Sequence, residues 1–347
     1  MSNELHDQML ENYTTLRVGG LADRVVVATT QDDIMATVKE CDANNIPLLI
    51  LGGGSNVVVA DDGWRGTVLL VRTNGFELAA DACSGATVTV EAGHNWDDFV
   101  AECVQREWSG VEALSGIPGT VGATPIQNVG AYGQDVSQTI AKVRTYDRTT
   151  QTTKTFLFAD CEFGYRTSVF KKEPERYVIL DVTYQLRLGE HSQPITYPEL
   201  ATALGVEVGK RSKLIPVREK VLDLRAAKAM VLDELDHDTW SVGSFFTNPI
   251  LSKIEAHNLP AQAPRWPQSD GTVKTSAAWL IEHSGFKKGF GLNARATLST
   301  KHTLAITNRG DASAEDVLEL AHHIQHQVHE RFGINLAIEP NLVGEYS

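Results

Sequence analysis

The chain has 347 residues, of which 42% are hydrophobic and 22% are charged, and its formal net charge is −13. This composition predicts a soluble globular protein, and the length is typical of two or three domains. The negative charge argues against a nucleic-acid backbone as the main partner, whereas a small anionic ligand needs only a local basic cluster.

The N-terminus and the cysteines predict a cytoplasmic protein with no membrane partner. The first residues, MSNELHDQMLEN, are acidic and lack the apolar core of a secretory signal. The most apolar stretches, 47–51 and 67–71, have the length of strands and are far too short to span a membrane. No CxxC motif is present, and the four cysteines are expected to be reduced thiols: Cys41, Cys83, Cys103 and Cys161.

Strand and helix signals alternate over the first hundred residues. Strands are expected at 21–29, on both sides of the glycine turn within 46–63, at 67–71 and at 86–93. Helices are expected at 30–45, starting at Thr30 or Asp32, and at 95–108. This pattern indicates a mixed α and β fold.

A nearly uncharged run rich in glycine and proline follows, VEALSGIPGTVGATPIQNVGAYGQDV at 111–136. A surface linker would be more polar and more charged. Because glycine lets the backbone approach a neighbour closely, the run predicts backbone packed against something such as a bound cofactor.

The remaining chain again mixes strands and helices. Strands are expected at 142–148, 177–188, 302–308 and 334–340, and helices at 195–205, 217–235, 275–285 and 313–333. Ser313 and Asp316 form a capping box at the start of the last helix, and Gly333 stands where that helix would end.

The glycine turn GGGSN (52–56) has two open interpretations. The Rossmann motif needs G-x-G-x-x-G at the start of a helix, but Val57 replaces the third glycine and a β-branched run follows. The turn therefore joins two strands. It is either a plain hairpin or an anion-binding nest of N–H groups, with Ser55 and Asn56 adding polar contacts.

The histidine run HHIQHQVH (322–329) is interpreted as a solvated helix face, and no metal is predicted. At 100° per residue, one face collects the apolar residues Val317, Leu320, Ala321, Ile324 and Val328. The opposite side collects His322, His323, His326 and His329.

Three polar residues have ordinary explanations when each is taken alone. Ser244, in GSFFTNP, would cap a turn. Arg166, in GYRTS, would be a surface charge or an ion-pair partner, and Glu339, in IEP, would lie at the surface.

The motifs as an ordered set resemble a known family. GGGSN, SGIPGTVGATPIQNVGAYG, GYR, GSFFTNP, AAWLIE and IEP occur in the order found in the UDP-N-acetylenolpyruvoylglucosamine reductase (MurB) family, flavoenzymes of peptidoglycan synthesis. The resemblance runs from TTLRVGG (14–20) to IEP (338–340), and the 115–133 run is its most specific part. It implies an α+β fold: a two-subdomain FAD-binding fold of the vanillyl-alcohol-oxidase (PCMH) type with a smaller α+β substrate-binding domain.

The resemblance also implies non-covalent FAD and NADPH as the hydride donor. The GGGSN turn would hold the pyrophosphate through backbone N–H groups, and the 115–132 run would surround the rest of the cofactor. The implied cofactor-binding residues are Gly52, Gly53, Gly54, Ser55, Asn56, Ser115, Gly116, Ile117, Pro118, Gly119, Gly122, Ala123, Gln127, Asn128, Gly130, Ala131 and Tyr132.

The implied reaction delivers hydride from the flavin to C3 of an enolpyruvyl group and a proton to C2. Ser244 matches the family's proton donor, and Arg166 and Glu339 match the pair that binds the substrate carboxylate and stabilises the intermediate. The guanidinium supplies a permanent charge in a fixed fork, and a neutral Glu339 could donate a hydrogen bond.

The segment between Arg166 and Ser244 resembles the substrate-gating insert of the type I members. Tyr197 matches the tyrosine that covers the substrate diphosphate, Lys228 and Asn248 match nucleotide contacts, and Arg225 is a further candidate. Two stretches depart from the family pattern. Residues 229–242 lack the commoner proline, and NLVGEYS follows IEP where the family usually has an acidic residue and an arginine.

These matches predict a monomer with four regions. Residues 1–65 and 66–229 would be FAD-binding subdomains, 230–337 the substrate-binding domain and 338–347 a C-terminal strand and tail. Two alternatives remain. An FAD-dependent alcohol or sugar oxidase of the same fold would often carry a His or Cys for covalent flavin attachment beside the turn, and a non-catalytic FAD- or nucleotide-binding module would not be reduced by NADPH.

Overall fold

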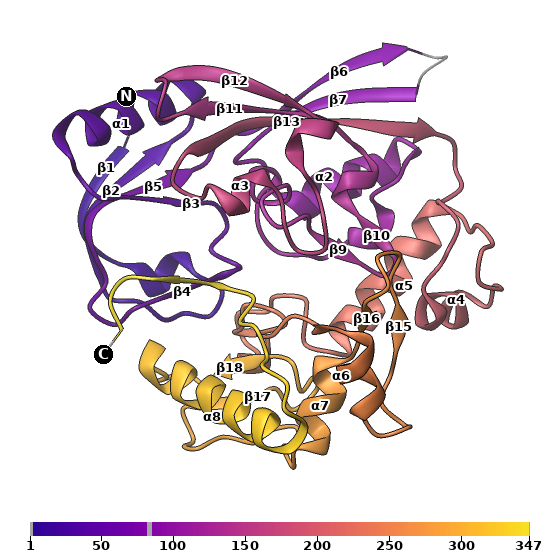
Figure 1. Cartoon of the computed structure of the whole chain (residues 1–347). Helices are drawn as coiled ribbons and strands as arrows, with labels where there is room; N and C mark the ends of the chain where they lie inside the picture. Colours follow the sequence, from indigo (N-terminus) through magenta and orange to yellow (C-terminus); the bar gives the residue numbers. More distant parts are fainter. Residues whose placement is uncertain (1–2, 82–84, 347) are drawn as a thin grey trace. The chain divides into compact units, whose positions relative to one another are not determined.

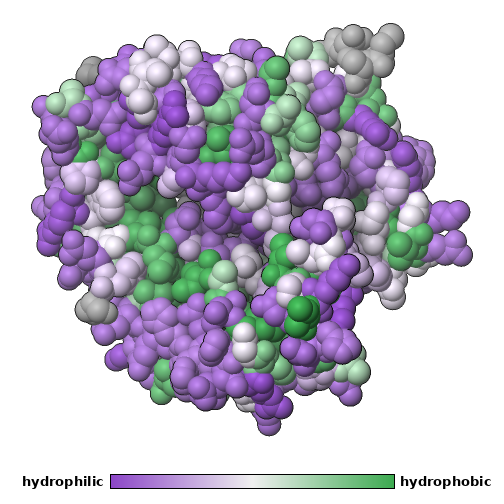
Figure 2. Space-filling view, in the orientation of Figure 1, coloured by the Kyte–Doolittle hydropathy of each residue, from purple (hydrophilic) through white to green (hydrophobic). Residues whose placement is uncertain are grey.

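The computed structural model describes residues 3–81 and 85–346, and the chain divides into two compact units. Unit 1 comprises residues 1–8, 22–53 and 65–227, and unit 2 comprises residues 9–21, 54–64 and 228–347. Within the described ranges, no helix is long and apolar enough to cross a membrane. Hydrophilic residues cover most of the face in view in Figure 2, in keeping with the charged composition.

The first sheet of unit 1 has the strand order β1-β2-β5-β3 and is accompanied by helix α1 (Gln31–Asn44). Its strands are β1 (Asn3–Met9), β2 (Leu21–Ala28), β3 (Leu48–Leu51) and β5 (Trp64–Val71). Thr30 is the N-cap of α1, because its hydroxyl accepts from the N–H of Asp33 while the Asp33 carboxylate accepts from the N–H of Thr30.

The second sheet of unit 1 has the order β12-β11-β13-β7-β6, with β8 paired to the end of β13 (Figure 1). Its strands are β6 (Phe76–Asp81), β7 (Gly85–Glu91), β8 (Trp108–Ser109), β11 (Ile140–Asp147), β12 (Thr152–Leu157) and β13 (Tyr177–Leu188). Helix α2 (Trp96–Gln105) packs Trp96, Phe99 and Val100 into the same core as Val88 and Val90 of β7. This core fixes the first residues of α2, which contact the glycine-rich run.

The segment after β13 contains helices α4 (Pro198–Leu204) and α5 (Leu214–Ala226), which share a small core with Ala113. The short helix α3 (Val169–Lys172) precedes β13. The predicted helix at 217–235 is wrong beyond Ala226, where α5 ends. Ala229 has φ +54°, a left-handed conformation that a continuing α-helix cannot contain.

Unit 2 is built around helix α8 (Ala314–Phe332), which begins with the predicted capping box and ends at Gly333 in the left-handed conformation. Its other helices are α6 (Lys253–Asn258) and α7 (Ala277–His283). Its strands are β4 (Val57–Val59), β14 (Ile250–Leu251), β15 (Trp266–Pro267), β16 (Val273–Lys274), β17 (Ala296–Leu298), β18 (Ile306–Asn308) and β19 (Asn341–Val343). The five apolar residues predicted for one face of α8 are all completely buried.

The histidines of α8 lie away from that core. His322, His326 and His329 are exposed and His323 is half-buried against the rings of Phe286 and Phe290. Over the described part of the chain, no cluster of three His, Cys, Asp or Glu side chains is arranged to hold a metal ion. Cys41, Cys103 and Cys161 are buried free thiols, and Cys83 lies outside the described residues.

Two further expectations about strands are wrong. The plain hairpin at the glycine turn does not form, because β3 pairs with β5 and β4 pairs with β19. The strand expected at 334–340 is reduced to a single bridge between Ile338 and Phe246, and the regular strand begins only at Asn341. Pro340 has no N–H to contribute to a ladder, which separates the bridge from the strand.

Candidate active site

The first two glycines of the GGGSN turn pack directly against the glycine-rich run within unit 1. A Cβ atom on Gly53 would lie 2.6 Å from the Cα of Gly119, and one on Gly52 would lie 2.5 Å from the Thr120 hydroxyl oxygen. Any side chain at Gly53 would therefore force two backbone segments apart. The close approach predicted for the run is present.

The middle of the run is held by backbone bonds to the short segment that joins β7 to α2. The N–H of Gly122 donates to the Ala92 carbonyl at 2.8 Å, and the N–H of Val121 donates to the His94 carbonyl at 2.9 Å. A Cβ on Gly122 would lie 2.6 Å from the Cβ of Ala92. These backbone bonds fix the middle of the run without a charged side chain.

The end of the run forms a tight hairpin of β9 (Gly130–Ala131) and β10 (Gln134–Asp135). Tyr132 and Gly133 make the turn with φ values of +48° and +84°. The ring of Tyr132 meets that of Tyr197 edge-on, with centroids 5.5 Å apart. Burial raises the pKa of Tyr132 to about 12, so its hydroxyl stays protonated at neutral pH.

Arg166 lies beside this hairpin. Its Nη2 donates to the Gly130 carbonyl at 3.0 Å, and its backbone has φ +54°. Asn128, which is buried, fixes the same loop by donating from Nδ2 to the Gly164 carbonyl at 3.1 Å. A left-handed arginine is strained, and such strain persists where the surroundings impose it, often at functional sites.

Arg225 is the second arginine of this part of unit 1. It is half-buried in the last turn of α5, next to Tyr132 and Asp97. Burial lowers the pKa of its guanidinium, while the neighbouring Tyr132 and Asp97 act in the opposite direction. Unit 1 therefore brings together Gly52, Gly53, the 115–132 run and three of the predicted side chains: Arg166, Tyr197 and Arg225.

Unit 2 contains the other predicted site residues. Backbone hydrogen bonds join the segment that follows Ser244 to the segment that contains Glu339. The Phe245 carbonyl accepts from the N–H of Glu339 at 2.9 Å, and the N–H of Thr247 donates to the Ala337 carbonyl at 3.0 Å. Phe245 and Phe246 are buried, so the segment that carries Ser244 is anchored by its aromatic side chains. Ser244 is half-buried and Glu339 is buried.

The last part of the glycine turn joins the same region of unit 2. The Asn56 carbonyl accepts from the N–H of Asn341 at 3.0 Å, and β4 then pairs in parallel with β19. Gly54 has φ +63°, and a Cβ there would lie only 1.9 Å from the Tyr13 carbonyl oxygen. Asn56 is thus bonded to the first residue of β19, which lies two residues after Glu339 in the sequence.

Asn248 and Lys228 have different surroundings in unit 2. The Asn248 side-chain oxygen accepts a hydrogen bond from the N–H of Ala277 at 3.0 Å, at the start of α7. This hydrogen bond therefore contributes to the fold rather than to ligand binding. Lys228 is half-buried at the first position of the last segment of unit 2.

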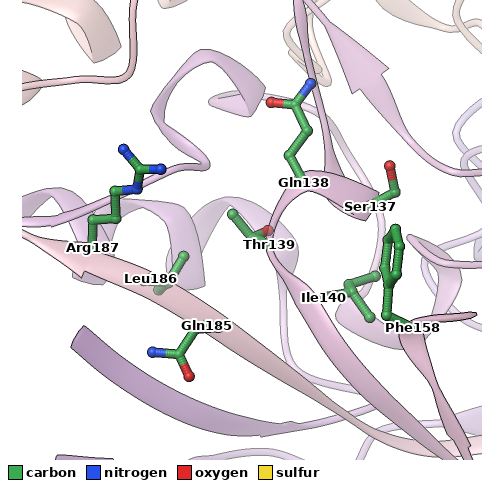
Figure 3. Close-up of a pocket in the computed structure, with 8 residues that line it drawn as sticks. All are labelled: Ser137, Gln138, Thr139, Ile140, Phe158, Gln185, Leu186 and Arg187. Carbon is green, nitrogen blue, oxygen red and sulfur yellow. The ribbon is translucent and has the colours of Figure 1, made fainter. Parts of the chain in front are cut away.

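A pocket elsewhere in unit 1 contains none of the predicted site residues. It has a volume of about 430 Å³, and Figure 3 shows its lining: Ser137, Gln138, Thr139, Ile140, Phe158, Gln185, Leu186 and Arg187. Arg187 is its one charged lining residue, and no acid or base partner stands beside it in this lining. The pocket does not offer the groups that the predicted chemistry needs.

Sequence reasoning missed two acids that organise unit 1. Glu112 is completely buried and accepts from the N–H of Gly110 at 2.6 Å, from Gln134 Nε2 at 3.0 Å and from the N–H of Gln193 at 2.8 Å. Asp97 binds Gly116 and Arg218. The available signal for Glu112 was that it is one of only two charges, with Asp135, in a nearly uncharged run, whereas Asp97 is ordinary in the first turn of a helix.

Comparison with known proteins agrees with this geometry. Residues 22–155 match the model of an FAD binding domain, which defines the chain as an FAD-binding protein. Residues 233–343 match the model of the UDP-N-acetylenolpyruvoylglucosamine reductase C-terminal domain.

Two similar proteins are both named UDP-N-acetylenolpyruvoylglucosamine reductase. The one from Cutibacterium acnes is 55% identical over 97% of this chain and 90% of its own length. The one from Streptomyces coelicolor is 52% identical over 98% of this chain and 90% of its own length. The chain belongs to the UDP-N-acetylenolpyruvoylglucosamine reductase (MurB) family.

A solved structure supports the fold. The reductase MurB from Thermus caldophilus superposes with a TM-score of 0.65 and covers 99% of each chain at 23% identity. The predicted α+β FAD-binding fold with an additional MurB-type domain is confirmed.

Proposed function

We propose that the chain carries out the reaction of its family, the NADPH-dependent reduction of UDP-N-acetylenolpyruvoylglucosamine to UDP-N-acetylmuramate, with the site residues named above. Family membership over nearly the whole chain supports the activity. The pairing of 245–247 with 337–339 carries the site assignment, because it places the segments of Ser244 and Glu339 side by side in unit 2. No observation favours the oxidase alternative.

The residues present fit FAD. The backbone around Gly52, Gly53 and Gly119 leaves no room for side chains, as a close cofactor-binding surface requires. The turn with Ser55 and Asn56 would hold the pyrophosphate, and the run from Ser115 to Tyr132 would bind the rest of the cofactor. When bound, FAD supplies hydride chemistry, taking hydride from NADPH and passing it to the substrate carbon.

Three side chains act on the substrate. Arg166 holds its carboxylate and stabilises the negative charge that develops when hydride arrives at C3. Glu339 donates a hydrogen bond to the same carboxylate. Ser244 gives its hydroxyl proton to C2; a hydroxyl is a weak acid, but the carbanion-like intermediate is a strong enough base to take it.

Four further residues bind the sugar nucleotide. Tyr197 covers the diphosphate, and Lys228 and Arg225 supply positive charge that suits a doubly anionic group. Asn248 contributes the donor groups that remain after its oxygen has bound Ala277.

We propose the remaining assignments on the basis of the sequence. The protein is a cytoplasmic monomer without a nucleic-acid or membrane partner. The FAD-binding subdomains span 1–65 and 66–229, the substrate-binding domain spans 230–337, and 338–347 form the C-terminal strand and tail.

Anaerobic stopped-flow absorbance of the purified protein tests the function. NADPH should bleach the flavin band, and UDP-N-acetylenolpyruvoylglucosamine should restore it without oxygen. Recovery with oxygen alone would support an oxidase, and bound flavin that NADPH leaves oxidised would support a binding module.

A further inference from the structure

Helix α5 presents one face to the glycine-rich run. Residues 218, 222 and 225 share this face, because they are spaced four and three positions apart. A Cβ on Gly116 would lie 2.7 Å from Cδ2 of Leu222 and 3.4 Å from Nε of Arg225. The loop at Gly116 therefore lies directly on α5.

Asp97 joins the loop and the helix. Its Oδ1 accepts from the N–H of Gly116 at 2.5 Å and from Nη1 of Arg218 at 2.6 Å, and its Oδ2 accepts from Nη2 of Arg218 at 2.7 Å. The two side chains of this ion pair are 31% and 19% exposed. Such a bidentate, partly desolvated pair fixes geometry more firmly than an exposed one.

The pKa of Asp97 agrees with a carboxylate that stays ionised in place. Burial alone would raise this pKa, but the hydrogen bonds from Arg218 and the Gly116 N–H outweigh burial and hold it below its usual range.

The start of α2, which carries Asp97, is itself bound to the run. The N–H of Trp96 donates to the Gly119 carbonyl at 3.1 Å, and His94 accepts from Val121. The start of α2, the run and α5 are thus tied together, and the side chain of Asp97 touches both the run and α5.

The position of α5 determines where two proposed substrate contacts lie. Arg225 is in its last turn, next to Tyr132. Tyr197 precedes α4, which packs on α5 through Leu200, Val217 and Val221, and its ring contacts Tyr132. A shift of α5 would move both side chains relative to the cofactor-binding run.

We propose that Asp97 is a positioning residue that docks the substrate-gating segment on the cofactor-binding run, so that Arg225 and Tyr197 are placed for the diphosphate of the sugar nucleotide. This inference rests on the roles proposed above for Arg225 and Tyr197. Asp97 acts through its bonds to Arg218 and Gly116.

Two variants and one control test this role. Asp97→Asn removes the charge, and Arg218→Gln removes the helix contact while the bond from Gly116 to Asp97 remains. Asp42→Asn is the control, because Asp42 of α1 forms a comparable ion pair with Arg148 in the β11–β12 turn, and these side chains are 17% and 20% exposed.

Steady-state kinetics, flavin reduction and thermal unfolding are measured for all variants. We expect KM for UDP-N-acetylenolpyruvoylglucosamine to rise on the order of tenfold in Asp97→Asn and in Arg218→Gln, because small misplacements of binding groups are costly. Flavin reduction by NADPH should stay within about twofold of wild type, and the double variant should be no worse than either single one. Asp42→Asn should lose about as much thermal stability as the two test variants, but its KM for the sugar nucleotide should be unchanged.

Three results would overturn the role. These are a KM in both variants equal to that of Asp42→Asn, additive effects in the double variant, or flavin reduction slowed as much as turnover. Wild-type protein that does not oxidise NADPH with the sugar nucleotide would instead refute the proposed function.

Discussion

At the scale of single residues, the glycines of the GGGSN turn and of the glycine-rich run allow two backbone segments to pack closely. A glycine-to-alanine substitution, which adds one methyl group, tests this steric role. Gly53→Ala would place a Cβ 2.6 Å from the Cα of Gly119, and neither backbone can yield cheaply. We expect the variant to bind FAD on the order of a hundredfold more weakly. Titration of the apoprotein with FAD, followed by flavin fluorescence, measures this affinity.

Gly75→Ala is the matched control for that substitution. Gly75 has φ +113°, which is unfavourable for alanine, but a Cβ there would meet nothing within 4 Å. It should lose some stability and keep its FAD affinity. Equal loss of FAD affinity in the two variants would show that the contact with Gly119 has no special importance.

Two substitutions at Glu339 separate the effect of its proposed hydrogen bond to the substrate carboxylate from the effect of side-chain size. Glu339→Gln keeps a hydrogen-bond donor of the same shape, whereas Glu339→Ala removes it. We expect flavin reoxidation by the sugar nucleotide to slow by about 10² to 10³-fold in the alanine variant and by less than about tenfold in the glutamine variant. Equal rates in the two variants would argue against a donor role.

At the scale of elements, the ends of α8 follow directly from sequence. Ser313, Asp316 and Gly333 were predicted to cap the helix, and they do so because each satisfies a specific backbone requirement. Of the predictions that failed, the hairpin at the glycine turn depends on partners farther along the chain, whereas the end of α5 depends on a residue close to it in sequence. The end of α5 depends on the left-handed Ala229, and the separation of β3 from β4 depends on β5 and β19.

The capping box of α8 makes stability depend on pH. Hydrogen bonds from Arg295 and the cap at Ser313 outweigh burial and lower the pKa of Asp316 to about 2. In the unfolded chain an aspartate has a pKa of about 3.9. Because the pKa is lower in the folded protein, the ionised Asp316 stabilises the fold at pH values above about 3.9, and this stabilisation is lost as the pH falls toward 2.

Asp316→Asn should therefore lower the free energy of unfolding by about 1 kcal/mol at pH 7. The difference from wild type should shrink below about pH 4. Urea unfolding at several pH values measures it, with Glu319→Gln, an exposed change on the same helix, as the control. A difference that stays constant from pH 7 to pH 3 would contradict the ionised cap.

At the scale of the whole molecule, the ordered motifs predicted the family and its FAD-binding fold, which the comparisons confirm. The same motifs did not reveal that the chain crosses between the two units four times before Lys228, so that the GGGSN turn itself belongs to both. They also missed Asp97 and Glu112. Such acids are recognised only when the chain brings Gly116 or Gln193 to them.

The most direct test of the account separates the two half-reactions in Ser244→Ala, with Thr247→Ala as the control for loss of a neighbouring hydroxyl. Under anaerobic stopped flow, we expect NADPH to reduce the flavin of both variants at the wild-type rate. The sugar nucleotide should then reoxidise Ser244→Ala about 10² to 10⁴-fold more slowly than wild type, because the proton for C2 is missing. Reoxidation of Ser244→Ala at the wild-type rate would contradict the assignment of Ser244 as the proton donor.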